Sequence, residues 1–117
     1  MTKYMIVTNN PSVQEKYDVI QEVEGDFRDV LVAVRDLIHL GWRPLTHPLP
    51  ASIRMMYSPV RSVVVTEESH DQSYEIIDQA MDLYDRTMGQ RKPDYVNLED
   101  YRLLDLELLT ASLEDLS

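Results

Sequence analysis

Residues 25–41 read GDFRDVLVAVRDLIHLG and carry the clearest helical pattern in the chain. Phe27 and the apolar residues after it recur at the spacing of one helical face, while the charged residues lie mostly off that face. Asp26 can cap the helix start, and Asp29 falls in the first turn, where negative charge suits the helix dipole. Because Gly41 stands where helices commonly end in glycine, the pattern predicts an amphipathic helix over about Phe27–Leu40.

Two extended segments precede this helix. Lys3–Thr8 has an apolar, β-rich centre, which is typical of a strand buried on both faces. Tyr17–Glu24 is also predicted to contain a strand. Between them, Asn10 is a good N-cap and Pro11 a good first helical residue, so a short helix is expected over about Pro11–Lys16.

The rest of the chain adds further strands and a long helix. Val60–Thr66 contains three consecutive valines and is predicted to lie centrally in a sheet, and Trp42–Leu45 is a candidate short strand. Ser69 and Gln72 form a capping-box pattern ahead of a helix over about Asp71–Met88. The face that this helix is expected to bury carries Tyr74, Ile77, Met81, Tyr84 and Met88.

The alternation of strands and helices predicts the fold class. We expect one small layered α/β domain over residues 1–117, with a three- or four-stranded, mostly parallel sheet flanked by helices. A leucine-rich C-terminal helix is expected within residues 97–117, at about Leu98–Leu116. Its leucines spread around much of the circumference, so it either lies buried between layers or packs on a second subunit in a homodimer. Both alternatives stay open.

Composition excludes several classes of protein. The net charge is −10, and all of it falls in residues 67–117, with four Lys/Arg against 14 Asp/Glu. Binders of nucleic acid or of anionic membrane surfaces present a basic face, so we expect neither partner. The acidic half is either a solvated surface or a docking surface for a basic partner. Without cysteine, thiol catalysis and Cys-ligated metals are excluded, and without a long apolar run we expect a cytoplasmic protein.

Polar residues gather after the predicted strands. The Gly41–Ile53 loop is stiffened by three prolines. Ligands of open α/β sheets bind beyond the carboxyl ends of the strands, and a third such end leads into Thr66 and His70. If the strands are parallel neighbours, these ends form one polar rim. The candidate ligand-binding residues are Thr8, Asn9, Asn10, Thr46, His47 and Ser52.

Each candidate also has a purely structural interpretation. Asn9 and Asn10 suit a turn and a helix cap as well as an anion site, and His47 suits a hydrogen-bonded loop as well as a general base. No second histidine or carboxylate stands at metal-ligand spacing from His47, so no metal or other cofactor is predicted. Ser52 lacks the Gly-x-Ser-x-Gly context of a hydrolase nucleophile. No catalytic residue is assigned, and a non-catalytic role is favoured.

Several stretches together resemble the GrdX family. They are Ile6–Pro11, Asp29–Leu31 continuing through Val34–His39, Leu45–Leu49, Ser52–Ile53, and Ser58–Pro59 to Ser62. The resemblance covers about residues 4–66 and rests more on the Asp29–His39 and Leu45–Leu49 stretches than on Ile6–Pro11. Its most specific feature is the combination of Thr-Asn-Asn-Pro with Thr-His-Pro-Leu at this spacing. GrdX proteins are small cytoplasmic proteins encoded beside the glycine, sarcosine and betaine reductase genes of amino-acid-fermenting anaerobes. The family has no established activity.

The resemblance implies a setting, and two hypotheses fit it. The first is a non-catalytic accessory protein that binds reductase subunits, which the acidic half and the leucine-rich helix favour. It predicts that replacing His47 is tolerated, whereas charge reversal at Asp78, Asp82 and Asp85 is not. The second is a small-molecule or anion-binding protein, or a minor enzyme, with its site at the loops Thr8–Pro11 and Thr46–Ser52. The stiff polar loop favours this second hypothesis.

Overall fold

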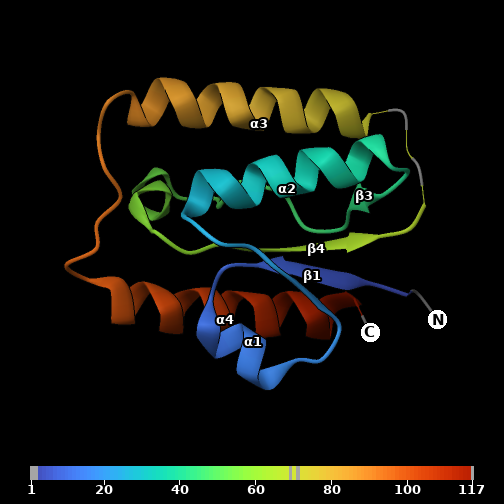
Figure 1. Ribbon diagram of the computed structural model, residues 1–117, viewed down its shortest axis with the longest axis horizontal. Helices are drawn as coiled ribbons and strands as arrows, with labels where there is room; N and C mark the ends of the chain where they lie inside the picture. The colour runs from blue at the N-terminus through green and yellow to red at the C-terminus, as the bar shows by residue number, and fades with distance from the viewer. Residues whose placement is uncertain (1–2, 69, 71, 117) are drawn as a thin grey trace.

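The computed structural model describes residues 3–68, 70 and 72–116 (Figure 1). Every predicted helix and strand has a counterpart in it, and one short 3-10 helix, η1, is added. The capping pair that was predicted to include Ser69 lies partly outside the described residues. In chain order the elements are β1 (Met5–Thr8), α1 (Pro11–Lys16), β2 (Ile20–Glu22), α2 (Phe27–His39), β3 (Arg43–Pro44), η1 (Ile53–Tyr57), β4 (Ser62–Thr66), α3 (Ser73–Met88) and α4 (Leu98–Leu116).

The α/β class is confirmed, but the prediction of a mostly parallel sheet is wrong. The sheet has four strands in the order β2-β1-β4-β3. β1 and β2 pair in parallel, whereas β4 pairs antiparallel with both β1 and β3. Three strands therefore run in one direction, and β4 is inserted between them in the other. As predicted, the valine strand is central, and all five of its residues are buried.

The direction of β4 follows from the connection that leads into it. A parallel neighbour requires a crossover of a dozen or more residues that returns the chain to its starting edge, usually as a helix on one face of the sheet. Between β3 and β4 the chain instead forms the proline-stiffened loop and η1, which remain at the edge where β3 ends. The chain then re-enters the sheet from that edge, and β4 runs antiparallel.

Helices cover both faces of the sheet (Figure 1). Val7, Val63 and Val65 point towards α2, which carries α3 on its outer side, and they share one apolar core with these helices. Ile6 and Val64 alternate to the other face and meet Val13 of α1 and Leu109 of α4. This alternation is the period of two that a strand imposes, and it divides the core into a large and a small cluster.

The start of α2 confirms the capping prediction. The Asp26 side chain accepts from the backbone N–H of Arg28 at 3.0 Å, and the Asp29 carboxylate accepts from the N–H of Asp26 at 2.8 Å. Phe27, the first residue inside the helix, is buried and stacks on Tyr84 of α3 with ring centroids 5.0 Å apart. The cap therefore fixes the start of α2, where Phe27 packs against α3.

One predicted core residue of α3 is instead exposed. Tyr74 leaves 46% of its surface accessible and meets the edge of the His39 ring, while Ser73 and Ala80 are buried instead. Ser73 and Ala80 therefore belong to the buried face of α3, while Tyr74 lies at its margin against His39 of α2. Ile77, Met81, Tyr84 and Met88 are buried as predicted.

Replacing Gly25 by alanine is expected to lower the free energy of unfolding by about 1–2 kcal/mol. Gly25 has φ +118°, and an added Cβ would lie 2.0 Å from Oδ2 of Asp29. The carboxylate would have to leave its bond to Asp26, so both backbone strain and cap loss contribute. Urea unfolding followed by circular dichroism measures the change.

Gly89→Ala is the control for the Gly25 substitution. Gly89 also has positive φ, +54°, but no described atom lies within 4 Å of an added Cβ. The substitution at Gly89 therefore carries backbone strain alone and is expected to destabilise less. Equal losses at the two glycines would contradict the role assigned to the Asp26–Asp29 cap.

Candidate functional site

The polar edge of the sheet is where β1 and β3 end and β4 begins. Asn9 and the loop containing His47 leave this edge together, as predicted. Because β4 is antiparallel, its end at Thr66 lies at the opposite edge, and the prediction that Thr66 and His70 join the same rim is wrong. The first residue of β4, Ser62, takes their place.

Asp105 of α4 ties this edge together from one side. It is buried, and its carboxylate oxygens accept from Ser62 N at 3.0 Å, Ser62 Oγ at 2.7 Å and Asn10 Nδ2 at 3.0 Å. Ser62 Oγ in turn lies 2.7 Å from Thr8 Oγ1. Asn10 also caps α1 by accepting from Ser12 N. These groups satisfy one another, so Thr8 and Asn10 hold α4 on the sheet and have no side-chain surface left for a ligand.

The Asn9 side chain also joins separate segments of the chain through hydrogen bonds. Its Nδ2 donates to the carbonyls of Gly25 and Pro59 at 3.1 and 2.8 Å, and its Oδ1 accepts from Arg61 N at 2.9 Å. One amide side chain thus joins the turn before α2 to the segment that enters β4. All of its polar atoms are in use, so Asn9 is a structural residue here.

Arg61 carries the charge at this edge. Its Nε and Nη2 donate to the carbonyls of Pro48 and His47 at 3.0 and 2.8 Å, and its Cζ lies 5.9 Å from the centroid of the Phe27 ring. Among the described residues no carboxylate forms an ion pair with it, and its Nη1 has no hydrogen-bond partner. Burial lowers the pKa of the Arg61 guanidinium, and the charge of Asp105 opposes that shift.

A cavity of about 300 Å³ lies between the 46–55 loop and α4. Arg61 and His47 line it, and none of its described lining residues is acidic. A further space of about 30 Å³, enough for one water, extends from it towards Ser62 and Asp105. The remaining lining residues of the larger cavity are Thr46, Leu49, Pro50, Ala51, Ser52, Met55, Leu108 and Ser112.

Thr46, His47 and Ser52 all line this cavity, but they differ in how many of their polar side-chain atoms already form hydrogen bonds. Thr46 Oγ1 accepts from Val64 N at 3.0 Å and so completes the edge of β4 where β3 has ended. His47 is exposed, and its Nδ1 lies 3.0 Å from Leu49 N and 3.2 Å from the Leu49 carbonyl oxygen, so it bonds to the backbone of Leu49 in either tautomer. Ser52 precedes η1 without capping it through its side chain, so its hydroxyl is free.

The six predicted residues therefore divide into two groups. Thr46, His47 and Ser52 line one cavity, whereas Thr8, Asn9 and Asn10 form the framework behind it. Sequence reasoning missed Arg61 and Asp105, which organise both groups. Asp105 had a signal, because it lies four residues before Leu109 and so shares a helical face with a core leucine.

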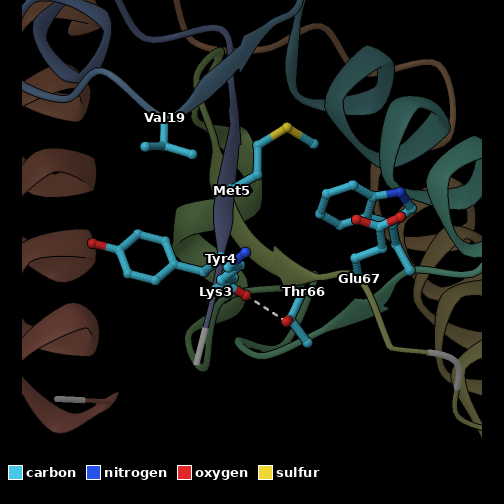
Figure 2. A pocket seen from close by; sticks show the side chains of 7 residues that line it. Lys3, Tyr4, Met5, Val19, Thr66 and Glu67 are labelled. Carbon is cyan, nitrogen blue, oxygen red and sulfur yellow. Dashed lines mark hydrogen bonds between the residues drawn. The ribbon is translucent and has the colours of Figure 1, made fainter. Parts of the chain in front are cut away.

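A second hollow, of about 630 Å³, lies at the opposite edge of the sheet (Figure 2). Tyr4 and Met5 leave β1 in opposite directions there, so the hollow wraps around a strand instead of forming a closed cleft. Thr66 Oγ1 already donates a hydrogen bond to the carbonyl of Lys3. Since Lys3 is also where the described chain begins, we assign no ligand to this hollow.

The outer face of α4 is the other candidate for function. Asp105 and Leu109 are its buried residues, and Leu106 and Leu113 pack against the small core. Leu103, Leu104 and Leu108 remain 55%, 42% and 47% exposed. The prediction of a two-sided apolar helix is confirmed, and one side has no cover in the single chain. No described helix is both long and apolar enough to cross a membrane.

No metal site emerges from the described residues. Among residues 3–68, 70 and 72–116, no three His, Asp or Glu side chains gather closely enough to hold an ion. Cation–carboxylate pairs such as Arg28–Asp85 and Arg86–Asp82 are exposed and belong to the solvated surface.

Fold, cavity and exposed helix define a small α/β protein with a mixed sheet and an arginine at its polar edge. A family model described as GrdX-like protein matches residues 5–114, so the chain belongs to the GrdX-like family. The resemblance predicted over about residues 4–66 is confirmed and extends through α3 into α4. Comparisons with curated proteins and with solved structures find no match.

Proposed function

We propose that this protein is a non-catalytic accessory protein of the glycine, sarcosine and betaine reductase system. It binds a reductase subunit in the cytoplasm through the exposed face of α4. Membership of the GrdX-like family supports the setting. The observation that carries the mode of action is the exposure of Leu104 and Leu108, which lie one turn apart on α4, with Leu103 also exposed further round the helix.

Charge defines the chemistry of the partner. Around the circumference of α4, Asp100 and Glu107 lie between Leu103 and the Leu104–Leu108 pair, and Glu114 and Asp115 follow towards the carboxyl end. Arg102 is the helix's only basic residue, and it is paired with Glu99. A complementary surface has an apolar ridge flanked by Lys or Arg, as on a basic amphipathic helix.

The acidic residues of α3 are less suited to this role than the sequence suggested. Asp85 pairs with Arg28 at 2.8 Å, and Asp82 pairs with Arg86 at 3.0 Å. A partner would have to displace these arginines before it could use either carboxylate. We therefore propose α4 as the docking surface in place of Asp82 and Asp85, while Asp78 forms no ion pair with another described residue.

A homodimer through residues 97–117 is the alternative. Two copies of α4 packed on one another would place their carboxylates side by side with one paired arginine each. Like charges brought together at an interface oppose association, so a basic partner is favoured over a second copy. Sedimentation of the pure protein separates the two, because only the homodimer raises its mass without a partner.

Leu104→Asp is expected to weaken binding to purified glycine reductase at least about tenfold. The substitution places a charge in an apolar interface without a partner for it. Isothermal titration calorimetry measures the affinity, with circular dichroism to confirm that each variant folds.

Leu83→Asp is the matched control, because Leu83 is also 42% exposed but lies on α3, across the sheet from α4. It should bind as the unchanged protein does. Equal weakening by both substitutions would point to general loss of solubility, and no measurable binding of the unchanged protein would contradict the proposed function.

A further inference from the structure

The Arg61 cavity has features that docking through α4 does not use. It contains a guanidinium whose Nη1 lacks a partner among the described residues, in a chain of net charge −10. The described lining of the cavity holds no carboxylate, although the charge of the buried Asp105 behind it acts on Arg61. Asp105 lines only the small space behind the cavity, and its oxygens already accept from Ser62 and Asn10.

The geometry points to a binding site for a small aliphatic carboxylate, with its charged end on Arg61 and its carbon chain against Leu49, Met55 and Leu108. Binding at this site needs no partner protein, although Leu108 belongs both to its wall and to the proposed docking face of α4. A carboxylate accepts well from a guanidinium, and charge-assisted bonds of this kind are the stronger ones. The free hydroxyls of Ser52 and Ser112 are further donors in the same lining.

The lining also decides between kinds of anion. Leu49, Pro50, Ala51, Met55 and Leu108 make most of the wall apolar. A phosphate ion would leave this wall uncovered and bring a second charge that no described basic side chain in the lining offsets. A volume of about 300 Å³ is at the small end of ligand sites, which suits a chain of a few carbons.

Arg61 reaches the cavity because the fold holds it from behind. Asn9 fixes its backbone N–H, and the carbonyls of His47 and Pro48 fix Nε and Nη2. The guanidinium is thereby oriented before any ligand binds, so little side-chain entropy remains to be lost on binding. The same contacts fix the loop that forms the opposite wall.

Titration with sodium butyrate, followed by ¹H–¹⁵N correlation spectra at constant ionic strength, tests the site. We expect saturable shifts in the 46–55 loop and at Arg61, with a dissociation constant on the order of 1 mM. Butyramide has the same shape without the charge and should bind at least about tenfold more weakly. Equal affinity for the amide, shifts that never saturate, or tighter binding of inorganic phosphate would each overturn the proposal.

Ser112→Phe and Ala111→Phe test the position of the site without altering Arg61. Ser112 lines the cavity, whereas its neighbour Ala111 is exposed and does not. Phenylalanine at position 112 should fill the cavity and abolish the butyrate shifts, while phenylalanine at position 111 should leave them unchanged. Arg61→Gln should weaken butyrate at least about tenfold, with Arg54→Gln as its exposed control. Unchanged binding by Ser112→Phe would place the ligand elsewhere and overturn the assignment.

Discussion

Asp105→Ala is expected to lower the free energy of unfolding by about 3–5 kcal/mol. The carboxylate accepts three hydrogen bonds from Ser62 and Asn10, all within a buried cluster. Alanine leaves the Ser62 N–H and one N–H of Asn10 Nδ2 without an acceptor, while Nδ2 still donates to the Arg102 carbonyl at 2.9 Å. Each stranded donor costs about 1–3 kcal/mol. Urea unfolding, followed by circular dichroism, measures the loss.

Two further substitutions separate the hydrogen bonds from the helix itself. Asp105→Asn keeps the shape and an acceptor for Ser62 N, but turns an amide towards Asn10 Nδ2, so an intermediate loss is expected. Asp100→Ala removes an exposed carboxylate from the same helix and should change stability by less than about 0.5 kcal/mol. A loss at Asp105→Ala as small as that at Asp100→Ala would show that the buried cluster does not anchor α4.

Tyr84 is expected to make the fold sensitive to alkali. Burial, followed by the charges of Asp26 and Asp85, raises the pKa of Tyr84 from 10.0 to about 12. The unfolded chain therefore loses this proton at a lower pH than the folded chain, and stability falls as pH rises between these values. A difference of two pKa units lowers the free energy of unfolding by about 2.7 kcal/mol once the pH exceeds the pKa of Tyr84 in the folded chain. At pH 11 the loss is about half of that.

Tyr84→Phe removes this titration and leaves the ring that stacks on Phe27. Between pH 8 and pH 11, the free energy of unfolding should therefore fall by about 1.4 kcal/mol less in the variant than in the unchanged protein. The difference between the two pH values is compared within each protein, so any cost of the substitution itself cancels. An equally steep alkaline loss in the variant would contradict the assignment.

Local patterns predicted the helices well. Asn10 and Pro11 define the start of α1, Asp26 and Asp29 define the start of α2, and each of these features acts within one turn of chain. Such short-range chemistry is visible in the sequence because the interacting groups are neighbours. The bounds of α4 were predicted equally well, from Leu98 to Leu116.

The direction of β4 and the role of Arg61 depend on contacts between distant residues. Nothing in Val63–Val65 distinguishes a parallel from an antiparallel central strand, since both are buried on both faces. Arg61 is one charged residue beside a strand, and its partners at Asn9, His47 and Pro48 are brought to it only by the sheet order. The sequence could place His47 and Asn9 at one edge but could not reveal the side chain that joins them.

These contacts also explain how His47 supports the loop beside the cavity. Its Nδ1 holds the backbone of Leu49, and its carbonyl holds Arg61, so the imidazole shapes the loop that walls the cavity. No described carboxylate forms a hydrogen bond or ion pair with it that would orient it as a general base. The proposed roles of the protein are therefore both binding roles, one on α4 and one in the cavity.

The most direct test of the proposed accessory function is whether a reductase covers α4. Leucine methyl spectra of the labelled protein, recorded with and without purified glycine reductase, report this residue by residue. We predict that the methyl signals of Leu103, Leu104 and Leu108 shift or broaden on addition, while those of Leu83 and Leu40, which are exposed elsewhere, stay unchanged. Unchanged signals from all three α4 leucines at saturating reductase would contradict the account.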